Sequence, residues 1–131
     1  MELIKTPLDS NIVKVEIGAD YNEEKNVISG TVELDIENQA YFVDIINSIF
    51  DEGNIRVIVD MQNVSYIDSS GLWALFEGHK KAEQKNGKLV LLKPTKDVKR
   101  VLDITKMSSK IQLYSDETIA IEELKTESET S

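Results

Sequence analysis

The sequence predicts an α/β fold: a mixed, mostly parallel β-sheet with about four helices packed on it and an N-terminal β-hairpin. Segments with the period of a strand alternate along the chain with segments that have the period of a helix. Two strand segments, residues 55–61 and Lys88–Leu92, are almost continuously apolar, as expected of strands covered on both faces. The length of 131 residues suits a single domain.

The N-terminal part is expected to be mainly β structure. Residues 1–11 have no clear period and contain Pro7, so we interpret them as an arm or an added edge strand. Apolar and polar residues alternate in residues 12–17 and again in residues 27–34, which predicts two strands, the first with one solvent-exposed face. The polar residues 22–26 indicate a turn, so the two strands are expected to pair as a β-hairpin.

Helices and buried strands alternate in the rest of the chain. A helix should begin after Asn38 and end near Gly53, because apolar residues recur between them at steps of three and four. Residues 65–70 are expected to be a connection, followed by a second helix over residues 70–86. Next come the strand Lys88–Leu92, a short helix that begins near Pro94, a short strand over residues 111–114 and a last helix capped by Asp116.

The domain is expected to span residues 12–124. Residues 125–131 consist mainly of Glu, Ser and Thr, which predicts an acidic disordered tail. No stretch approaches the length of a membrane span, and the N-terminus has no basic region followed by an apolar run. We therefore expect a cytoplasmic protein.

The composition excludes several kinds of site. The chain has no cysteine, so disulfides, thiolate metal sites and thiol nucleophiles are ruled out, and no residue cluster suggests a metal site or a cofactor. The formal net charge is −9, which argues against direct binding to nucleic acid or to an anionic membrane.

The segment with the most chemical information follows the buried strand at residues 55–61. It is a loop that leads straight into the second helix, Ile67-Asp68-Ser69-Ser70-Gly71-Leu72. Sites form at the carboxyl ends of strands in open α/β sheets, and the N-terminus of a helix presents free N–H groups there. On composition alone, Ser69 or Ser70 would be the N-cap of this helix.

Two catalytic or binding interpretations of this loop fail. A nucleophile elbow requires a glycine two residues before the serine, and the only histidine, His79, would lie roughly 14 Å along the helix axis from Ser70. The glycine patterns of nucleotide-binding loops are absent, although a helix N-terminus can still hold a phosphate. We therefore do not expect an enzyme.

The same segment resembles the core signature of STAS domains, in particular the bacterial anti-sigma factor antagonists, also called anti-anti-sigma factors. The resemblance covers roughly residues 12–124. The residues that carry it are Val57-Ile58-Val59-Asp60, Val64 to Leu72, Glu33-Leu34-Asp35 with Asn38 and Ala40, Gly87 to Leu91, and Val98 to Thr105.

The resemblance implies a switch protein that catalyses nothing itself. Ser69 would be phosphorylated by a GHKL-type serine kinase that is also the anti-sigma factor, with Ser70 as the second choice. The unphosphorylated form would bind that kinase and free the sigma factor, and a PP2C-type phosphatase would reset the switch. The implied partner-binding residues are Asp35, Asp68, Ser69, Ser70, Gly71, Leu72 and Trp73.

Two positions depart from the family's usual residues. The family commonly has glycine where this chain has Val32 and where it has Trp73. A tryptophan in the first turn of the helix could anchor a partner, since Trp is enriched in interface hot spots, or it could pack under the N-terminal hairpin.

Other functions are compatible with the same fold. The chain could be a STAS scaffold in a signalling complex, a regulatory domain linked to a transporter, or a module that binds a nucleotide or another small ligand. The sequence does not identify the kinase, the phosphatase or the sigma factor.

Overall fold

The computed structural model describes residues 1–8 and 11–130. A five-stranded sheet forms its centre. The strand order is β1 (Glu2–Pro7), β2 (Ile12–Gly18), β6 (Arg56–Asp60), β8 (Lys88–Leu92) and β9 (Leu113–Tyr114). Strand β1 is antiparallel to β2, and all other neighbours are parallel. The predicted mixed, mostly parallel sheet is thus confirmed.

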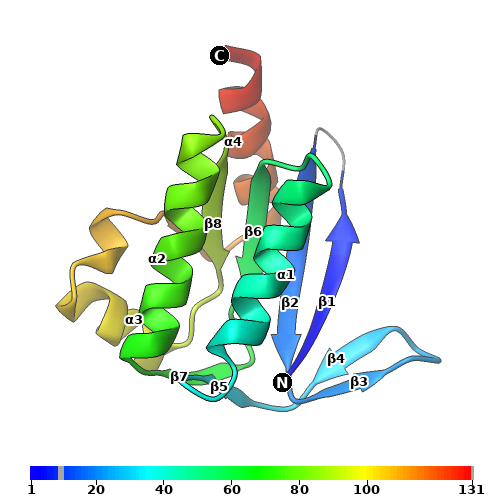
Figure 1. Cartoon of the computed structure of the whole chain (residues 1–131), viewed down its shortest axis with the longest axis vertical. Helices are drawn as coiled ribbons and strands as arrows, with labels where there is room; N and C mark the ends of the chain where they lie inside the picture. The colour runs from blue at the N-terminus through cyan, green and yellow to red at the C-terminus, as the bar shows by residue number, and fades with distance from the viewer. Residues whose placement is uncertain (9–10, 131) are drawn as a thin grey trace.

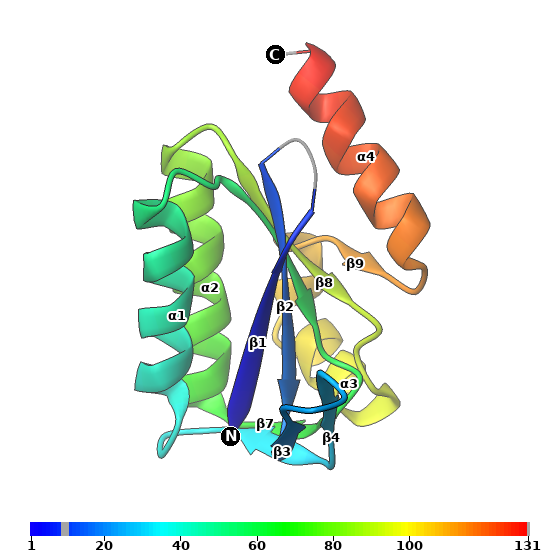
Figure 2. The ribbon, with the colours of Figure 1, turned by 90° about the vertical axis from the view of Figure 1, so that its right-hand side faces the viewer.

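Four α-helices surround this sheet, as predicted. They are α1 (Gln39–Asp51), α2 (Ser69–Gln84), α3 (Lys96–Ile104) and α4 (Glu117–Thr130), with a short 3₁₀ turn at Met107–Ser109. Figure 2 shows α1 and α2 side by side on one face of the sheet and α4 on the other. Helix α3 lies at the lower end of the molecule, beyond the start of α2 (Figure 1).

The two faces of the sheet explain the continuous apolar runs in the sequence. On β6, Val57 and Val59 belong to the large apolar core beneath α1 and α2, whereas Ile58 belongs to the smaller core beneath α4. All five residues of β6 are buried. A central strand with helices on both sides favours apolar residues at consecutive positions, and the sequence has them at Val57, Ile58 and Val59, between the buried charged residues Arg56 and Asp60.

The expected pairing of the N-terminal strands is wrong. Strand β2 pairs with β1 and with β6, not with residues 27–34. Those residues form two shorter strands, β4 (Val27–Ser29) and β5 (Val32–Leu34), and β4 pairs instead with β3 (Asp20–Asn22). The N-terminal hairpin is therefore β1–β2, and β3–β4 is a second hairpin that extends from the body of the molecule (Figure 1). Residues 1–8 thus provide the edge strand that was one of the two expectations.

The expected exposed face of β2 is also covered. Its polar residue Lys14 is only 17% exposed, and its Nζ lies 2.5 Å from Oε1 of Glu117 on α4. The alternation of apolar and polar residues correctly predicted the strand. It could not show that α4 covers the polar face, where Lys14 pairs with Glu117 instead of facing solvent.

A short strand, β7 (Val64–Ile67), occupies the segment that was expected to be a connection. It pairs in parallel with β5, so the two form a small separate sheet. This small sheet lies at the starts of α1 and α2 and carries the chain into α2 (Figure 1).

The predicted signals for the end of α1 and the start of α4 are present, but the C-terminal tail differs from the prediction. Gly53, with φ of 94°, follows the end of α1, and the carboxylate of Asp116 accepts a hydrogen bond from the N–H of Ile119 at the start of α4. Helix α4 then continues through Thr130, over most of the predicted disordered tail, because buried Leu124 anchors it to the sheet. Ser131 lies outside the described residues.

In the part of the chain that the structure describes, no helix has the length and apolar character needed to cross a membrane.

Candidate functional site

The N-terminus of α2 lies directly against the end of β5. A Cβ atom on Gly71 would come within 2.4 Å of the carbonyl oxygen of Leu34 and 2.7 Å of Cγ1 of Ile67. The N–H of Asp68 donates to the same Leu34 oxygen at 3.3 Å. Only glycine fits this close approach, so Gly71 sets how near α2 comes to the small sheet.

Asp68 is the N-cap of α2, and the expectation that Ser69 or Ser70 would cap the helix is wrong. Asp68 has an extended backbone, as an N-cap requires, and its Oδ1 accepts a hydrogen bond from the N–H of Gly71 at 2.9 Å. Ser69 and Ser70 are already helical. Asp68 therefore caps the helix, and the two serines are not needed for capping.

The second carboxylate oxygen of Asp68 reaches another part of the chain. Its Oδ2 accepts a hydrogen bond from the N–H of Ile36, at 3.2 Å, in the loop between β5 and α1. One side chain thus joins the start of α2 to that loop, and it fixes the loop beside the two serines.

The loop itself is held by two further side chains. Asn38 Oδ1 accepts from the N–H of Asp35 at 2.9 Å, and its Nδ2 donates to the carbonyl of Glu33 at 2.7 Å. Asn38 occupies the N-cap position of α1, but its side chain makes no capping bond there. Asp35, a predicted partner-binding residue, accepts from the N–H of Glu37 through Oδ1. Its carboxylate therefore closes a turn, which leaves it half-buried.

The two serines differ in their surroundings. Ser69 is exposed, whereas Ser70 is half-buried. Consecutive residues of a helix are about 100° apart around the axis, so the two hydroxyls point in different directions. Within residues 1–8 and 11–130, the Ser69 hydroxyl makes no hydrogen bond to another residue. It is available to an approaching molecule.

Trp73 lies one turn after Ser69 on the same side of α2. Residues four apart on a helix are neighbours, with Cβ atoms about 5–6 Å apart. Trp73 is 52% exposed, so it does not pack under the hairpin; that alternative is wrong. Leu72, by contrast, is half-buried and packs against the core, so it supports the helix more than it meets a partner.

Two more exposed apolar residues accompany Trp73 at this end of the molecule. Ile36, in the loop tied to Asp68, is 68% exposed, and Tyr66, at the end of β7, is 50% exposed. Both were missed in the sequence, where each appears in a segment expected to be an ordinary connection. The available signal was a large apolar side chain in an otherwise polar loop. We call Ile36, Tyr66 and Trp73 the apolar rim of Ser69.

The charges near Ser69 are negative. Asp35, Glu37 and Asp68 all belong to the loop or the cap, and the first turn of α2 has no acidic residue. Basic residues that favour the dipole of α2 lie at its other end, with Lys81 in the last turn and Lys85 at the C-cap. A new anion on Ser69 would therefore meet the positive end of the helix dipole and several carboxylates, but no lysine or arginine of the first turn.

His79 cannot serve Ser69 as a base. Its Nε2 lies 2.8 Å from Oε1 of Glu83, one turn further along α2, and its side chain is only 13% exposed beside the ring of Phe76. Among the described residues, no group of three or more His, Cys, Asp or Glu side chains could hold a metal ion.

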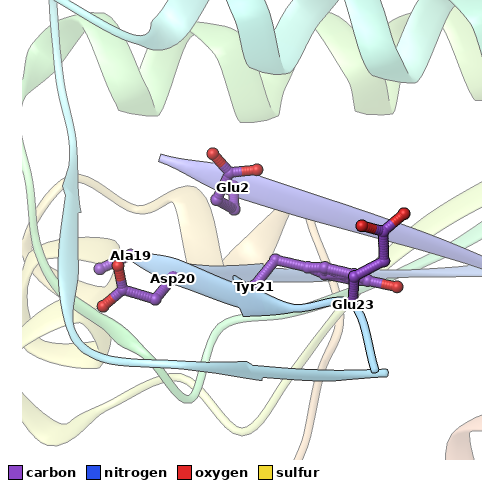
Figure 3. Close-up of a pocket in the computed structure, with 5 residues that line it drawn as sticks. All are labelled: Glu2, Ala19, Asp20, Tyr21 and Glu23. Carbon is purple, nitrogen blue, oxygen red and sulfur yellow. The ribbon is translucent and has the colours of Figure 1, made fainter. Parts of the chain in front are cut away.

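An acidic pocket of about 450 Å³ lies between β1 and the β3–β4 hairpin. Glu2 from β1 and Asp20, Tyr21 and Glu23 from the β3–β4 hairpin line it, together with Ala19. Figure 3 shows the three carboxylates spread around this pocket. No residue of the α2 N-terminus contributes to it, so it is separate from the site at Ser69.

Comparison with known proteins identifies the family. The family model described as the STAS domain matches residues 20–120. Among solved structures, the chain is similar to the protein TM1081 from Thermotoga maritima, with 21% identity, a TM-score of 0.77 and 94% of each chain covered. It is also similar to the unphosphorylated anti-sigma factor antagonist SpoIIAA, with 17% identity, a TM-score of 0.74, and 95% of this chain and 97% of that chain covered.

The same fold also occurs in another setting. A sulfate transporter family protein from Wolinella succinogenes has 16% identity and a TM-score of 0.72, with 95% of this chain and 93% of that chain covered. Structural similarity at these sequence identities establishes the fold. The function must be inferred from the residues of the candidate site.

Proposed function

Because the chain belongs to the STAS domain family, we propose that it is an anti-sigma factor antagonist that switches partners through phosphorylation of Ser69. The unphosphorylated form binds an anti-sigma serine kinase of the GHKL type and so frees a sigma factor for transcription. Phosphorylation releases the kinase, and a PP2C-type phosphatase restores the binding form. In this proposal the protein acts in the cytoplasm as a substrate and a binder, and it is not an enzyme.

The observation that supports this proposal most directly is the division of roles between Asp68 and Ser69. Asp68 caps α2 with one carboxylate oxygen and holds the loop at Ile36 with the other. Ser69 is exposed, and its hydroxyl makes no hydrogen bond to the described residues. A kinase can therefore modify its hydroxyl without breaking an interaction on which the fold depends.

Charge explains how a phosphate could act as a release signal. A phosphoserine adds about −1.5 to −2 charge at pH 7, beside the carboxylate of Asp68. A kinase that has just transferred a phosphoryl group also holds the phosphates of its spent nucleotide close to the modified hydroxyl. Juxtaposed like charges in an interface cost several kcal/mol. Because each 1.4 kcal/mol is a factor of ten in affinity, we expect a loss of at least about a hundredfold.

The apolar rim supports a protein partner rather than a free nucleotide as the first ligand. Ile36, Tyr66 and Trp73 are each at least half exposed, and large apolar side chains exposed together mark interaction sites. A partner that covers them would remove water from around Ser69, which strengthens the electrostatic effect of the phosphate.

Immobilised protein provides the test. We would compare the wild type with Ser69→Glu, Ser69→Ala and Ser70→Glu for capture from a native lysate, identify the captured proteins, and incubate any kinase with the wild type and ATP. The expected result is a GHKL-type kinase on the wild type and on Ser70→Glu, with none on Ser69→Glu. The kinase should phosphorylate the wild type and not Ser69→Ala.

Ser70→Glu is the matched control, because it adds the same charge one residue further along the helix. If both glutamate variants retain the same partners, Ser69 is not the gate, and the scaffold interpretation gains weight. If no kinase is captured and a nucleotide raises the melting temperature, the chain is a ligand-binding module instead.

A further inference from the structure

Helix α3 and the segment around it are basic in an otherwise acidic protein. Residues 93–110 contain six lysines and arginines and two aspartates, so their net charge is +4, while the chain as a whole carries −9. The rest of the chain therefore carries −13. A charge separation of this size creates a local field that favours acidic partners.

The basic side chains surround an exposed apolar residue. A shallow groove of about 290 Å³ is lined by Lys96, Lys99, Arg100, Asp103 and Ile104. Ile104 is 71% exposed, the highest value among the exposed large apolar residues of the described chain. Lys96, Arg100 and Ile104 follow one another at steps of four, so they form a stripe on one side of α3.

Two of the positive charges in this stripe are not neutralised within the molecule. Lys99 pairs with Asp103 at 3.3 Å. Lys96 and Arg100 form no ion pair or hydrogen bond through their side chains with the residues that the structure describes. We call Lys96, Arg100 and Ile104 the α3 stripe.

The β3–β4 hairpin has the complementary composition. Its turn carries Glu23 and Glu24, which have no basic partner among residues 1–8 and 11–130, and Asp20 lies at its base. Val27 on the hairpin is 50% exposed and Tyr21 is 36% exposed. Like the α3 stripe, the hairpin thus combines uncompensated charge with exposed apolar surface, but with the opposite sign.

We propose that the acidic β3–β4 hairpin of one copy of this chain docks on the α3 stripe of a second copy. The hairpin and α3 lie at opposite sides of the lower end of the molecule in Figure 1, so one copy cannot bring its own two surfaces together. After the first contact, one copy still has a free stripe and the other still has a free hairpin. The contact is head-to-tail, and it builds a short chain of copies or a closed ring.

The strength of this contact has a clear physical limit. Exposed ion pairs contribute little individually, and copies with a charge of −9 repel one another at long range. At 0.15 M salt the screening length is about 8 Å, so distant repulsion is screened while close pairs still act. The self-association should therefore be weak and reversible, and it needs high local concentration.

Charge-reversal variants provide the test, by sedimentation velocity at 0.15 M salt over protein concentrations up to the millimolar range. The wild type should show a sedimentation coefficient that rises with concentration. Lys96→Glu/Arg100→Glu alone and Glu23→Lys/Glu24→Lys alone should each remain monomeric. An equimolar mixture of the two variants should associate again, because it contains both the original and the reversed charge pairs.

Matched controls keep the net charge the same at other places. Lys80→Glu/Lys85→Glu on α2 and Asp44→Lys/Asp51→Lys on α1 should associate like the wild type. The proposal is overturned if the wild type is monomeric at every concentration, or if the mixed variants stay monomeric. It is also overturned if Trp73→Ala abolishes association, since the contact would then use the apolar rim. None of the charge variants alters Ser69, so this result is independent of the phosphorylation proposal.

Discussion

Asp68 and Ile36 are 32 residues apart in the chain and are joined by a hydrogen bond from the N–H of Ile36 to Oδ2 of Asp68. Because the other oxygen of the same carboxylate caps α2, the position of an exposed apolar side chain depends on a helix cap. The loop that carries Ile36 and the helix that carries Ser69 therefore keep a fixed relation.

Replacing Asp68 should separate its two roles. Asp68→Ala loses both hydrogen bonds and should lower the free energy of unfolding by roughly 2–3 kcal/mol, about 1 for the cap and the rest for the loop. Asp68→Asn keeps a good cap but offers one acceptor oxygen instead of two, so it should cost only about 1 kcal/mol. Urea unfolding measures both. No loss for Asp68→Asn would mean that the bond to Ile36 contributes nothing, and equal losses for the two variants would mean that the cap contributes nothing.

Gly71→Ala should be far more damaging than Gly78→Ala. At Gly71 the added methyl meets the carbonyl oxygen of Leu34 at 2.4 Å, and backbone must move, so we expect a loss of about 3 kcal/mol or more. At Gly78 the nearest atom is the tip of the Leu89 side chain at 2.9 Å, and the better helix propensity of alanine, worth about 1 kcal/mol, offsets the strain. Thermal unfolding of both variants compares them directly.

Ser69→Glu should leave the fold intact. The added carboxylate lies at the N-terminus of α2, where the helix dipole favours an anion by about 0.3–1 kcal/mol, and the nearby Asp68 opposes it. The melting temperature should therefore stay close to that of the wild type. A large drop would show that charge at Ser69 remodels the domain, contrary to a switch that acts at the surface.

The ion pair between Lys14 and Glu117 should lose its effect at high pH. Partial burial alone would lower the pKa of Lys14, but the hydrogen bond to Glu117 and the charges of Glu16, Glu117 and Asp60 outweigh it and raise the pKa. A raised pKa in the folded state means that the stabilisation is complete below the ordinary value, near 10.4, and is lost as pH rises through the higher folded value.

Lys14→Met should therefore cost about 1–2 kcal/mol from pH 7 to about pH 10, and the difference from the wild type should shrink above that. Denaturant unfolding at several pH values measures it, with Lys85→Met, at an exposed position, as a control that should show no loss. A difference that stays constant beyond pH 11 would contradict the assignment.

Trp73 should report and stabilise the complex with the proposed kinase. It is the only tryptophan, and it is half exposed, so its fluorescence emission should shift to shorter wavelength when a partner covers it. Trp73→Ala should weaken binding by about 2 kcal/mol, roughly thirtyfold, with little change in stability. Ile119→Ala, which removes an exposed apolar side chain on α4, is the control. Unchanged affinity for Trp73→Ala would remove the residue from the interface.

The sequence predicted the central sheet because burial on both faces leaves a strong mark. Strand β6 is apolar at consecutive positions, and the helix periods on either side are clear. The pairing of the strands is much harder to predict from local sequence patterns. The alternation in β2 showed that it is a strand, but it did not show which strands pair with it: β1 is an antiparallel neighbour, and β6 is a parallel neighbour more than thirty residues later in the chain.

The sequence located the site in the correct segment, but it assigned the helix cap to the serines instead of Asp68. Both Asp and Ser are good N-caps, so composition could not choose between Asp68 and the serines; the backbone conformation at Asp68 decides it. Strand β7 was missed because it has four residues and depends on pairing with β5, thirty residues earlier in the chain. That pairing brings Tyr66 and Ile36 to the same end of the molecule.

The edges of the sheet have a consequence for aggregation. A row of unpaired backbone groups at an edge is a template for strands from other molecules. Here β1 closes one edge and carries charged Lys5 and a proline, Pro7, which has no N–H to offer. At the other edge β9 is only two residues long. Both edges of the central sheet therefore disfavour pairing with a strand of another molecule, which lowers the risk of fibre formation.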